Sequence, residues 1–343
     1  MNSEEALLQI EHLHISFFTS NGVVNAVRDV NLTLNKGDVL GIVGESGSGK
    51  SVTTMSIVKL LAGTGRVTDG KILFHGEDLV DAKTKEMRKI RGEKIAVVFQ
   101  DPMSSLNPLI PIGKQIEEMI HEHHKNLSKK ELKEEVLKLL RLVRIPEAES
   151  RYKSYPHEFS GGMRQRAMIA MALANKPEIL IADEPTTALD VTIQDQIMKL
   201  MKNLQDEFNM SIIFITHDLG VVAEICTRVA VMYGGMIMEE GSIDEIFENP
   251  LHPYTMGLLA SVPDISQDKG KRLQSIPGSP PDMLKPPAGC PFAPRCLYAR
   301  NVCNQMVPPR TEISEGHSAL CWLISPEAPE DNPVKAAIRD RNR

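Results

Sequence analysis

Two kinds of hydrophobic pattern follow one another in the first part of the chain. Residues 7–34 alternate apolar and polar positions, as in LLQIEHLHISFF and VVNAVRDVNLTL, which predicts antiparallel strands with one buried face. VLGIVG at 39–44 is instead apolar and β-rich throughout, which predicts a strand buried on both faces. EILIAD and SIIFITHD repeat this character further on, separated by helical patterns. Buried strands that alternate with helices indicate an α/β fold with a parallel sheet.

The pattern changes twice more along the chain. Between about 104 and 165 it has helical spacing and many charges, as in IGKQIEEMIHEHHKNLSKKELKEEVLKLLRLVRI, which predicts a helical insertion into the α/β domain. After about residue 250 proline becomes dense, which favours extended segments and turns. We therefore predict an α/β domain over 1–250, a Pro- and Cys-rich C-terminal extension over 251–325, and a polar tail over 326–343.

Composition narrows the function classes. The 343 residues suggest roughly two domains, and a net charge of -6 gives no reason to expect a nucleic-acid partner. The acidic start, MNSEEALLQIEHL, lacks the basic and apolar regions of a secretory signal, and the apolar stretches fall short of the roughly 18 to 20 residues that cross a bilayer. The chain is expected to stay in the cytoplasm, and any membrane role to depend on a spanning partner.

GESGSGKS at 44–51 follows a predicted buried strand and precedes a helical pattern, which fits the phosphate-binding P-loop. Its glycines allow a tight turn whose N–H groups face phosphates at the positive end of a helix dipole. Lys50 would reach the β- and γ-phosphates of a nucleotide, and the Ser51 hydroxyl would bind Mg²⁺. The predicted nucleotide-binding residues of this loop are Gly44, Ser46, Gly47, Gly49, Lys50 and Ser51.

A second acidic element lies in ILIADEP. The apolar strand brings Asp183 to its C-terminal end, where a carboxylate can hold the Mg²⁺ shell. Glu184 follows directly and is placed to polarise an attacking water as a general base. The alternative for Glu184 is a structural salt bridge.

FSGGMRQR at 159–166, followed by TALD and ITHD, completes an ordered set that resembles the nucleotide-binding subunits of ABC transporters over residues 7–250. Met163 stands where many members carry Gln, a tolerated variation. The resemblance implies a P-loop NTPase fold of the ABC type, with an antiparallel β subdomain, a helical insertion and a small irregular C-terminal domain. The set consists of a Walker A motif at 44–51, the Q-loop Gln100, the signature at Ser160, Gly161, Gly162 and Met163, the Walker B residues Asp183 and Glu184, the D-loop Asp190 and the H-loop His217.

The resemblance also implies a mechanism. In the family two such domains pair head to tail, so that the signature of one closes over the ATP of the other. His217 would contact the γ-phosphate, and Gln100 would sense metal and water and link the site to the transmembrane partner. Phe17 is expected to stack on adenine, which would leave Phe18 as a core residue.

Three C-terminal segments resemble the extension of dipeptide and oligopeptide importer ATPases: NPLHPYTMGLLASVP, IPGSPPD and GCPFAPRC. This implies an ATPase at the cytoplasmic face of the cell membrane, with two permease subunits, a second ATPase subunit that is a paralogue rather than a copy, and an extracytoplasmic solute-binding protein. Relatives with this extension also move nickel or other small solutes, so the cargo stays open.

The opposing hypothesis is a soluble ABC ATPase that acts on DNA or ribosomes. DNA-repair members insert a long coiled coil between the two ATP motifs, whereas only about 130 residues separate Lys50 from Asp183 here. Translation-type members usually carry two cassettes, and this chain has one Walker A motif. A metal- or cluster-binding regulator with incidental ATPase activity would rest on the C-terminus alone.

Four cysteines, Cys290, Cys296, Cys303 and Cys321, are spaced C-x5-C-x6-C-x17-C. Structural zinc sites show tighter pairs, and four thiolates on an irregular loop are compatible with a 4Fe–4S cluster. Peptide-importer ATPases with this extension carry a 4Fe–4S cluster in it, so the resemblance to them favours a cluster on these four cysteines. Zinc and free or disulfide-forming thiols remain as alternatives. Cys226 is expected to be a small buried hydrophobe.

Overall fold

The computed structural model describes residues 6–187, 189–261, 275–326 and 328. Contacts within the chain divide it into two units. The insertion unit contains Leu34–Val39 and Asp81–Ile215, and the P-loop unit contains Leu7–Thr33, Leu40–Val80 and the described chain from Thr216 onward. The P-loop and the Cys-rich extension therefore belong to the same unit, although they are far apart in sequence. Apart from residues 326 and 328, the predicted polar tail lies outside the described residues.

A parallel sheet forms the centre of the insertion unit. Strand β7 (Ile179–Asp183) pairs in parallel with β6 (Ile95–Val98) on one side and with β8 (Ser211–Thr216) on the other. All of β8 and the first four residues of β7 are buried, and most of these residues are apolar, as expected for a parallel sheet that is covered on both faces. This arrangement confirms the predicted α/β class and brings the acidic end of β7 to the edge where parallel strands finish.

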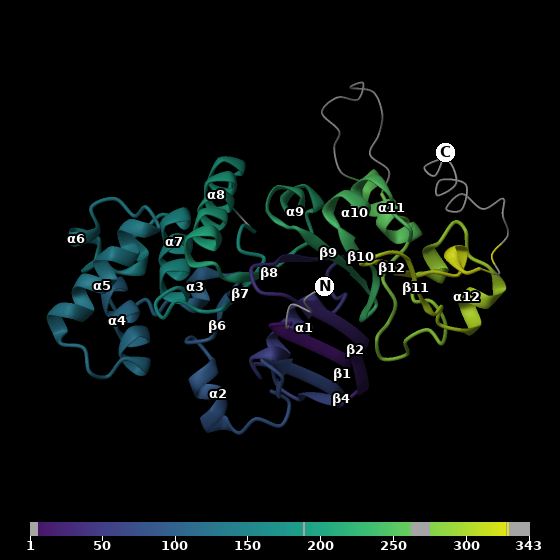
Figure 1. The fold of residues 1–343 in the computed structure, drawn as a ribbon, viewed down its shortest axis with the longest axis horizontal. Helices are drawn as coiled ribbons and strands as arrows, with labels where there is room; N and C mark the ends of the chain where they lie inside the picture. The colour runs from purple at the N-terminus through teal and green to yellow at the C-terminus, as the bar shows by residue number, and fades with distance from the viewer. Residues whose placement is uncertain (1–5, 188, 262–274, 327, 329–343) are drawn as a thin grey trace. The chain divides into compact units, whose positions relative to one another are not determined.

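Helices make up most of the rest of the insertion unit, and Figure 1 shows α4 to α7 grouped together. On α4 the isoleucines 112, 116 and 120 are buried, and their spacing of four residues places them on one face. Helix α5 starts at a capping box in which the Ser128 hydroxyl accepts from the N–H of Glu131 while the Glu131 carboxylate accepts from the N–H of Ser128. The helices are α2 (Thr84–Ile90), α3 (Pro102–Ser105), α4 (Ile112–His123), α5 (Lys129–Leu142), α6 (Ala148–Arg151), the 3-10 helix η1 (Pro156–Glu158), α7 (Gly161–Ala172) and α8 (Val191–Phe208).

The P-loop unit begins with an antiparallel sheet, as the alternating pattern predicts. Its strand order is β2 (Gly22–Leu34), β1 (Leu8–Thr19), β4 (Gly65–Phe74) and β5 (Glu77–Asp78). Strands β1 and β4 are antiparallel, with Leu8 opposite Phe74 and Phe17 opposite Gly65. Apolar residues of β1 such as Ile10, Leu13 and Ile15 are buried, so one face of this sheet belongs to the core.

A second group of strands carries the P-loop. Strand β3 (Val39–Val43) pairs in parallel with β9 (Arg228–Tyr233), and β9 pairs antiparallel with β10 (Met236–Ser242). The extension then adds a hairpin, β11 (Arg310–Ser314) and β12 (His317–Leu320), with β12 paired to β10. The helices of this unit are α1 (Lys50–Ile57), α9 (Leu219–Ile225), α10 (Ile243–Glu248), α11 (Pro253–Ala260), α12 (Asn301–Gln305) and the 3-10 helices η2 (Ala293–Arg295) and η3 (Trp322–Ile324).

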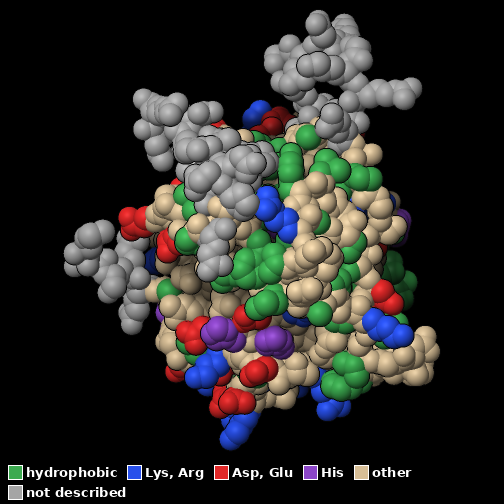
Figure 2. Space-filling view, turned by 90° about the vertical axis from the view of Figure 1, so that its right-hand side faces the viewer, with side chains coloured by type: hydrophobic (Ala, Val, Ile, Leu, Met, Phe, Trp, Pro, Cys, Tyr) green, Lys and Arg blue, Asp and Glu red, His purple; other side chains and the backbone are tan. Residues whose placement is uncertain are grey.

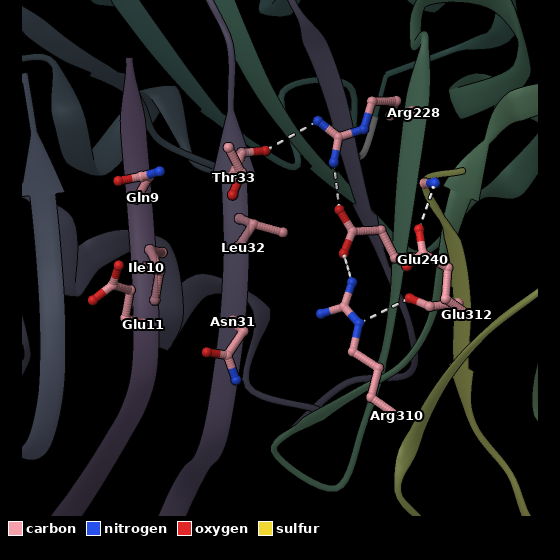
Figure 3. A pocket seen from close by; sticks show the side chains of 12 residues that line it. Gln9, Ile10, Glu11, Asn31, Leu32, Thr33, Arg228, Glu240, Arg310 and Glu312 are labelled. Atoms are coloured by element: carbon pink, nitrogen blue, oxygen red, sulfur yellow. Dashed lines mark hydrogen bonds and ion pairs between the residues drawn. The ribbon is translucent and has the colours of Figure 1, made fainter. Parts of the chain in front are cut away.

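A carboxylate on β10 ties the hairpin to the sheet (Figure 3). Glu240, whose side chain is 5% exposed, accepts from Arg228 at 2.5 Å and from Arg310 at 2.6 Å. Arg310 also donates to the Ser318 hydroxyl at 2.8 Å. A pocket of about 480 Å³ opens beside these groups and reaches Gln9 and its neighbours on β1 and β2. Both guanidinium groups that line the pocket already bind Glu240, and the lining also carries the carboxylates of Glu11 and Glu312.

The last feature of the fold is the distribution of hydrophobic residues in the helices and on the surface. Among the described residues, no helix combines the length and the apolar composition that crossing a membrane requires. Figure 2 looks onto the side where Figure 1 draws α12, and hydrophobic side chains are visible there between charged ones. Leu297 and Met306 of the extension are 86% and 58% exposed. Scattered exposure of this kind is normal for a protein surface.

Candidate functional site: a P-loop and its acidic partners

The P-loop unit holds the Gly-rich turn between β3 and α1. Gly44 has a φ of 152°, and a Cβ on it would come within 2.1 Å of the Met232 carbonyl oxygen. Gly49 has a φ of 102°, and a Cβ there would lie 2.8 Å from the Ala26 carbonyl oxygen. Both positions need glycine because the backbone of neighbouring strands approaches too closely for a side chain. The loop is thus fixed on its inner side by β2 and β9.

Lys50 is the first residue of α1, and its side chain folds back over the loop. Its ammonium donates to the carbonyl of Gly44 at 2.7 Å and to that of Glu45 at 3.0 Å, and the residue is 6% exposed. Ser46 and Gly47 form the exposed tip of the turn, and Ser51 is partly exposed. The loop therefore encloses a positive charge at a helix N-terminus, which is the electrostatic arrangement that binds phosphates.

The insertion unit places the two acidic residues at the end of β7. Asp183 is its last residue, and Glu184 follows with a φ of 45° and an N–H that donates to the Ile215 carbonyl at 3.0 Å. The amide of Gln100 donates to Oε2 of Glu184 at 2.9 Å, and the Thr187 hydroxyl donates to the same oxygen at 2.9 Å. The structure thus brings Gln100 and Glu184 together, 84 positions apart in sequence. These two bonds hold the carboxylate of Glu184 in one orientation.

The signature forms the N-terminus of α7. Ser160 caps this helix, its hydroxyl accepting from the N–H of Met163 at 3.3 Å. A Cβ on Gly161 would find its nearest neighbour at 3.9 Å, whereas one on Gly162 would lie 2.8 Å from a methyl group of Ile193 on α8. Gly162 therefore allows α7 to pack against the start of α8.

Asp190 begins that neighbouring helix. Its side chain caps α8, accepting from the N–H of Ile193 at 3.0 Å. The predicted signature and D-loop residues thus lie at two adjacent helix N-termini in the insertion unit. Such ends carry partial positive charge and favour anions.

The remaining predicted residues lie in the P-loop unit. The ring of Phe17 lies over Gly65 so closely that a Cβ there would be 2.6 Å from it. Phe18 is 48% exposed, so the expectation that it would be a core residue is wrong. Phe18 lies at the end of β1, where the last residue, Thr19, is also exposed. His217 follows the last residue of β8 and is exposed.

The predicted site residues therefore fall into two sets, one in each unit. Those of the P-loop unit are Phe17, Gly44, Ser46, Gly47, Gly49, Lys50, Ser51 and His217. Those of the insertion unit are Gln100, Ser160, Gly161, Gly162, Asp183, Glu184 and Asp190.

The four cysteines of the extension line one small pocket, together with Phe292. They are free thiols. Burial raises the pKa of Cys290 to about 11 and that of Cys321 to about 12, and burial also raises the pKa of Cys296. Desolvation thus disfavours the thiolate form of these three thiols.

The prediction of a 4Fe–4S cluster on Cys290, Cys296, Cys303 and Cys321 is wrong, because the side chains are not arranged as a ligand set. Within the described residues no group of three or more His, Cys, Asp or Glu side chains is arranged to hold a metal ion. Zinc, the alternative, lacks support for the same reason. His317, four residues before Cys321, is buried, and its Nε2 lies 2.9 Å from Oε1 of Glu239. Cys226 is buried as expected.

Sequence reasoning missed three residues near the site. Thr187 binds Glu184, and its place in TTALD close to the acidic motif was a signal that could have found it. Tyr254 accepts from the N–H of Glu45 at 2.9 Å, and Arg295 binds the Glu45 carboxylate at 2.7 Å. No local pattern marks Tyr254 or Arg295, because their partners lie more than 200 positions away.

Comparisons with known proteins agree with this geometry. A family model described as "ABC transporter" matches residues 27–187, and one described as "Oligopeptide/dipeptide transporter, C-terminal region" matches residues 238–303. Among solved structures, the chain is similar to the ATP-binding cassette MJ0796 in a dimeric post-hydrolysis state bound to ADP and Pi. That match has a TM-score of 0.63 and 30% identity, and it covers 69% of this chain and 98% of the other.

Curated relatives match over nearly the whole length. The oligopeptide transport ATP-binding protein OppD of Bacillus subtilis is 54% identical, covering 97% of this chain and 94% of the relative. The dipeptide transport ATP-binding protein DppD of Lactococcus lactis is 53% identical, covering 96% and 95%. The chain thus belongs to the ABC transporter family, as an ATP-binding and ATP-hydrolysing subunit of the oligopeptide and dipeptide transport type.

Proposed function

We propose that this chain hydrolyses ATP to power the import of dipeptides or oligopeptides through a membrane-embedded ABC transporter. The observation that carries the proposal is the joint presence of the ATP motifs and of a C-terminal region matched by the oligopeptide/dipeptide transporter model at 238–303. The relatives named as oligopeptide and dipeptide transport ATP-binding proteins support the same cargo class. Nickel or another small solute is the competing cargo.

Two ATP molecules would be enclosed between paired nucleotide-binding domains. The N-terminus of α7, with Ser160 as its cap, would close over the ATP held by the P-loop of the partner. The availability of this helix N-terminus as an anion site supports the arrangement, as does the dimeric form of the solved relative MJ0796. The partner would be a paralogous ATPase subunit. ATP would then join the two subunits, and hydrolysis would release them.

Each site residue has a proposed role. Lys50 would bind the β- and γ-phosphates, Phe17 would stack on adenine, and His217 would contact the γ-phosphate. Glu184 would act as general base toward the attacking water, with Gln100 and Thr187 fixing its carboxylate. The hydrogen bonds from these two side chains to one oxygen of Glu184 support the last assignment, because a general base must be oriented before it can accept a proton.

Mg²⁺ is the expected cation. Ser51 of the P-loop unit, and Gln100 and Asp183 of the insertion unit, each carry an oxygen, which is the hard ligand type that this cation prefers. When bound, Mg²⁺ would neutralise charge on the phosphate oxygens. The described residues supply the rest: a lysine at a helix N-terminus and a carboxylate held by two donors.

The transport role implies partners. The chain would bind two transmembrane permease subunits at the cytoplasmic face of the cell membrane, and an extracytoplasmic solute-binding protein would act through them. No nucleic-acid partner is proposed. Copurification with two permease-like proteins, and stimulation of ATP hydrolysis by peptide in the reconstituted complex, are the expected results. Copurification with ribosomes or DNA in their place would contradict the proposal, and stimulation by nickel but not by peptide would reassign the cargo.

The proposed chemistry has a direct test in Glu184→Gln. This variant should bind ATP as the wild type does but lose turnover, since an amide cannot accept the proton of the attacking water. Glu178→Gln is the matched control because Glu178 precedes β7 and pairs with Lys94 at 3.1 Å. ATP binding by equilibrium titration and phosphate release are measured together. Wild-type hydrolysis in Glu184→Gln would refute the assignment of the base.

A further inference from the structure

The extension places a buried arginine on the P-loop. The Arg295 side chain, at the end of η2, is 6% exposed. Its Nη1 donates to Oε2 of Glu45 at 2.7 Å and to the Tyr233 hydroxyl at 3.0 Å. Its Nε donates to the Pro277 carbonyl at 2.8 Å, and its Nη2 to the Ile276 carbonyl at 3.2 Å. All three nitrogens of the guanidinium group therefore have partners, and Glu45 is the anionic one among these contacts.

Glu45 lies inside the phosphate-binding loop and connects its parts. Its carbonyl accepts from the ammonium of Lys50 at 3.0 Å, and its N–H donates to the hydroxyl of Tyr254 at 2.9 Å. Its carboxylate binds Arg295. One residue of the loop thus contacts the phosphate-binding lysine, helix α11 and the extension. A displacement of Glu45 would move the carbonyl that orients Lys50.

Aromatic packing fixes the position from which Arg295 reaches the loop. The ring of Phe292, three residues before it, lies 5.3 Å from that of Tyr233 and 5.3 Å from that of Tyr254, in edge-to-face and tilted contacts. Pro291 packs so closely on the β9–β10 turn that a Cβ on Gly234 would come within 2.7 Å of it. The extension is therefore held against the loop by close packing as well as by the ion pair.

The ion pair between Arg295 and Glu45 affects the charge of the phosphate-binding loop. The loop is built to receive the negatively charged phosphates of a nucleotide, and an unpaired carboxylate on it would repel them. Arg295 cancels that charge from the buried side. Although burial alone would lower it, the hydrogen bonds to Glu45 and Tyr233 raise the pKa of Arg295. An arginine guanidinium stays charged near neutral pH, so Glu45 has a cationic partner there.

We infer that Arg295 is a positioning residue of the ATP site: acting through Glu45, it holds the P-loop in its phosphate-binding shape and neutralises the carboxylate that the loop carries. The inference rests on the proposed role of residues 44–51 as the phosphate cradle. It makes the peptide-transporter extension a structural part of nucleotide binding. Truncation of the extension should therefore weaken ATP binding.

The test uses the full-length chain and a titration with a fluorescent ATP analogue in the presence of Mg²⁺. Arg295→Gln should raise the Kd about tenfold, near the lower end of the loss expected for a hydrogen bond to a charged group, because Arg295 acts through Glu45 and not on the nucleotide itself. Arg310→Gln is the matched control, because it also removes an arginine that pairs with a buried carboxylate of this unit, Glu240. It should leave the Kd within about twofold of the wild type, since Glu240 has no place in the loop.

A second substitution separates positioning from general destabilisation. Adding Glu45→Gln to Arg295→Gln removes the uncompensated carboxylate, so the double variant should bind ATP more tightly than Arg295→Gln alone. A purely structural role of Arg295 would give no such recovery. Arg295→Lys covers the case in which Arg295→Gln does not fold. Lysine keeps the positive charge but lacks the planar set of N–H donors of the guanidinium group, so Arg295→Lys should raise the Kd about two- to fivefold.

Several outcomes would overturn the inference. These are a Kd of Arg295→Gln or Arg295→Lys equal to that of the wild type, an equal loss in Arg310→Gln, or no recovery in the double variant. Failure of the wild-type chain to bind ATP would instead overturn the proposed function itself. Wild-type binding with an unaffected Arg295→Gln would overturn only the role of Arg295.

Discussion

Thr187→Val is the sharpest test of how the acidic site is organised. Valine has nearly the shape of threonine but lacks the hydroxyl that donates to Oε2 of Glu184 at 2.9 Å. The Gln100 amide still donates to the same oxygen, so the carboxylate should become less restricted without being released. Because the Thr187 contact is exposed to solvent, its loss is worth the lower part of the range for hydrogen bonds, about 1 kcal/mol.

This magnitude predicts a defined kinetic pattern. If the lost bond orients Glu184 for proton transfer, kcat should fall about three- to tenfold, while ATP affinity stays unchanged because Thr187 belongs to the catalytic and not to the phosphate-binding part. Single-turnover phosphate release and equilibrium ATP titration separate the two quantities. Thr187→Ser keeps the hydroxyl and should keep the rate. An unchanged kcat in Thr187→Val, or an equal drop in Thr187→Ser, would refute the reasoning.

Two further predictions concern the P-loop unit. Gly44→Ala should abolish ATP binding, because its Cβ would lie 2.1 Å from the Met232 carbonyl oxygen. A Cβ on Gly47 would meet nothing within 4 Å, so Gly47→Ala should lower the folding stability by only about 1 kcal/mol, for its positive φ. ATP titration and circular dichroism compare the two variants. Burial lowers the pKa of His252 to about 3, and its ring accepts from the N–H of Tyr254. The neutral form is therefore the folded form, and stability should fall below pH 6.5, the unfolded value, by about 1.4 kcal/mol per pH unit toward pH 3. His252→Asn keeps a cap acceptor and should flatten this slope in urea unfolding; an unchanged slope would contradict the assignment.

The position of the Gly-rich loop in the fold could be predicted from the sequence because the pattern that forms it is local, and its nucleotide-binding role stays a prediction. A turn that wraps phosphate needs glycines at fixed offsets and a lysine at the start of the next helix. All of these residues lie within the eight positions 44–51, so a short stretch of sequence is enough to predict the turn. The acidic end of β7 could be predicted in the same way, since an apolar run that ends in Asp183 and Glu184 is typical of the strand that carries the metal-binding carboxylate of a P-loop enzyme. The structure then places Gln100 against Glu184.

The extension was harder to interpret because its contacts are not local. Its prolines suggested turns, yet it forms a hairpin that pairs with β10, and Glu240 joins Arg228 to Arg310 across 82 positions of the chain. The cysteine spacing suggested a cluster, but spacing does not report how side chains are arranged in space, and the described residues contain no group of ligands that could hold a metal ion.

The sequence alone thus determined the fold class, the place of the Gly-rich turn between a strand and a helix, and the place of Asp183 and Glu184 at the end of a strand, because hydrophobic period and short motifs encode strands, helices and turns within a few residues. Only the tertiary structure decided that Thr187 binds Glu184, that Phe18 is exposed, and that Arg295 reaches Glu45 across 250 positions of the chain. Such pairs form when packing brings distant elements together. An ion pair between residues far apart in the chain produces no periodic pattern in the sequence, so the sequence does not predict it.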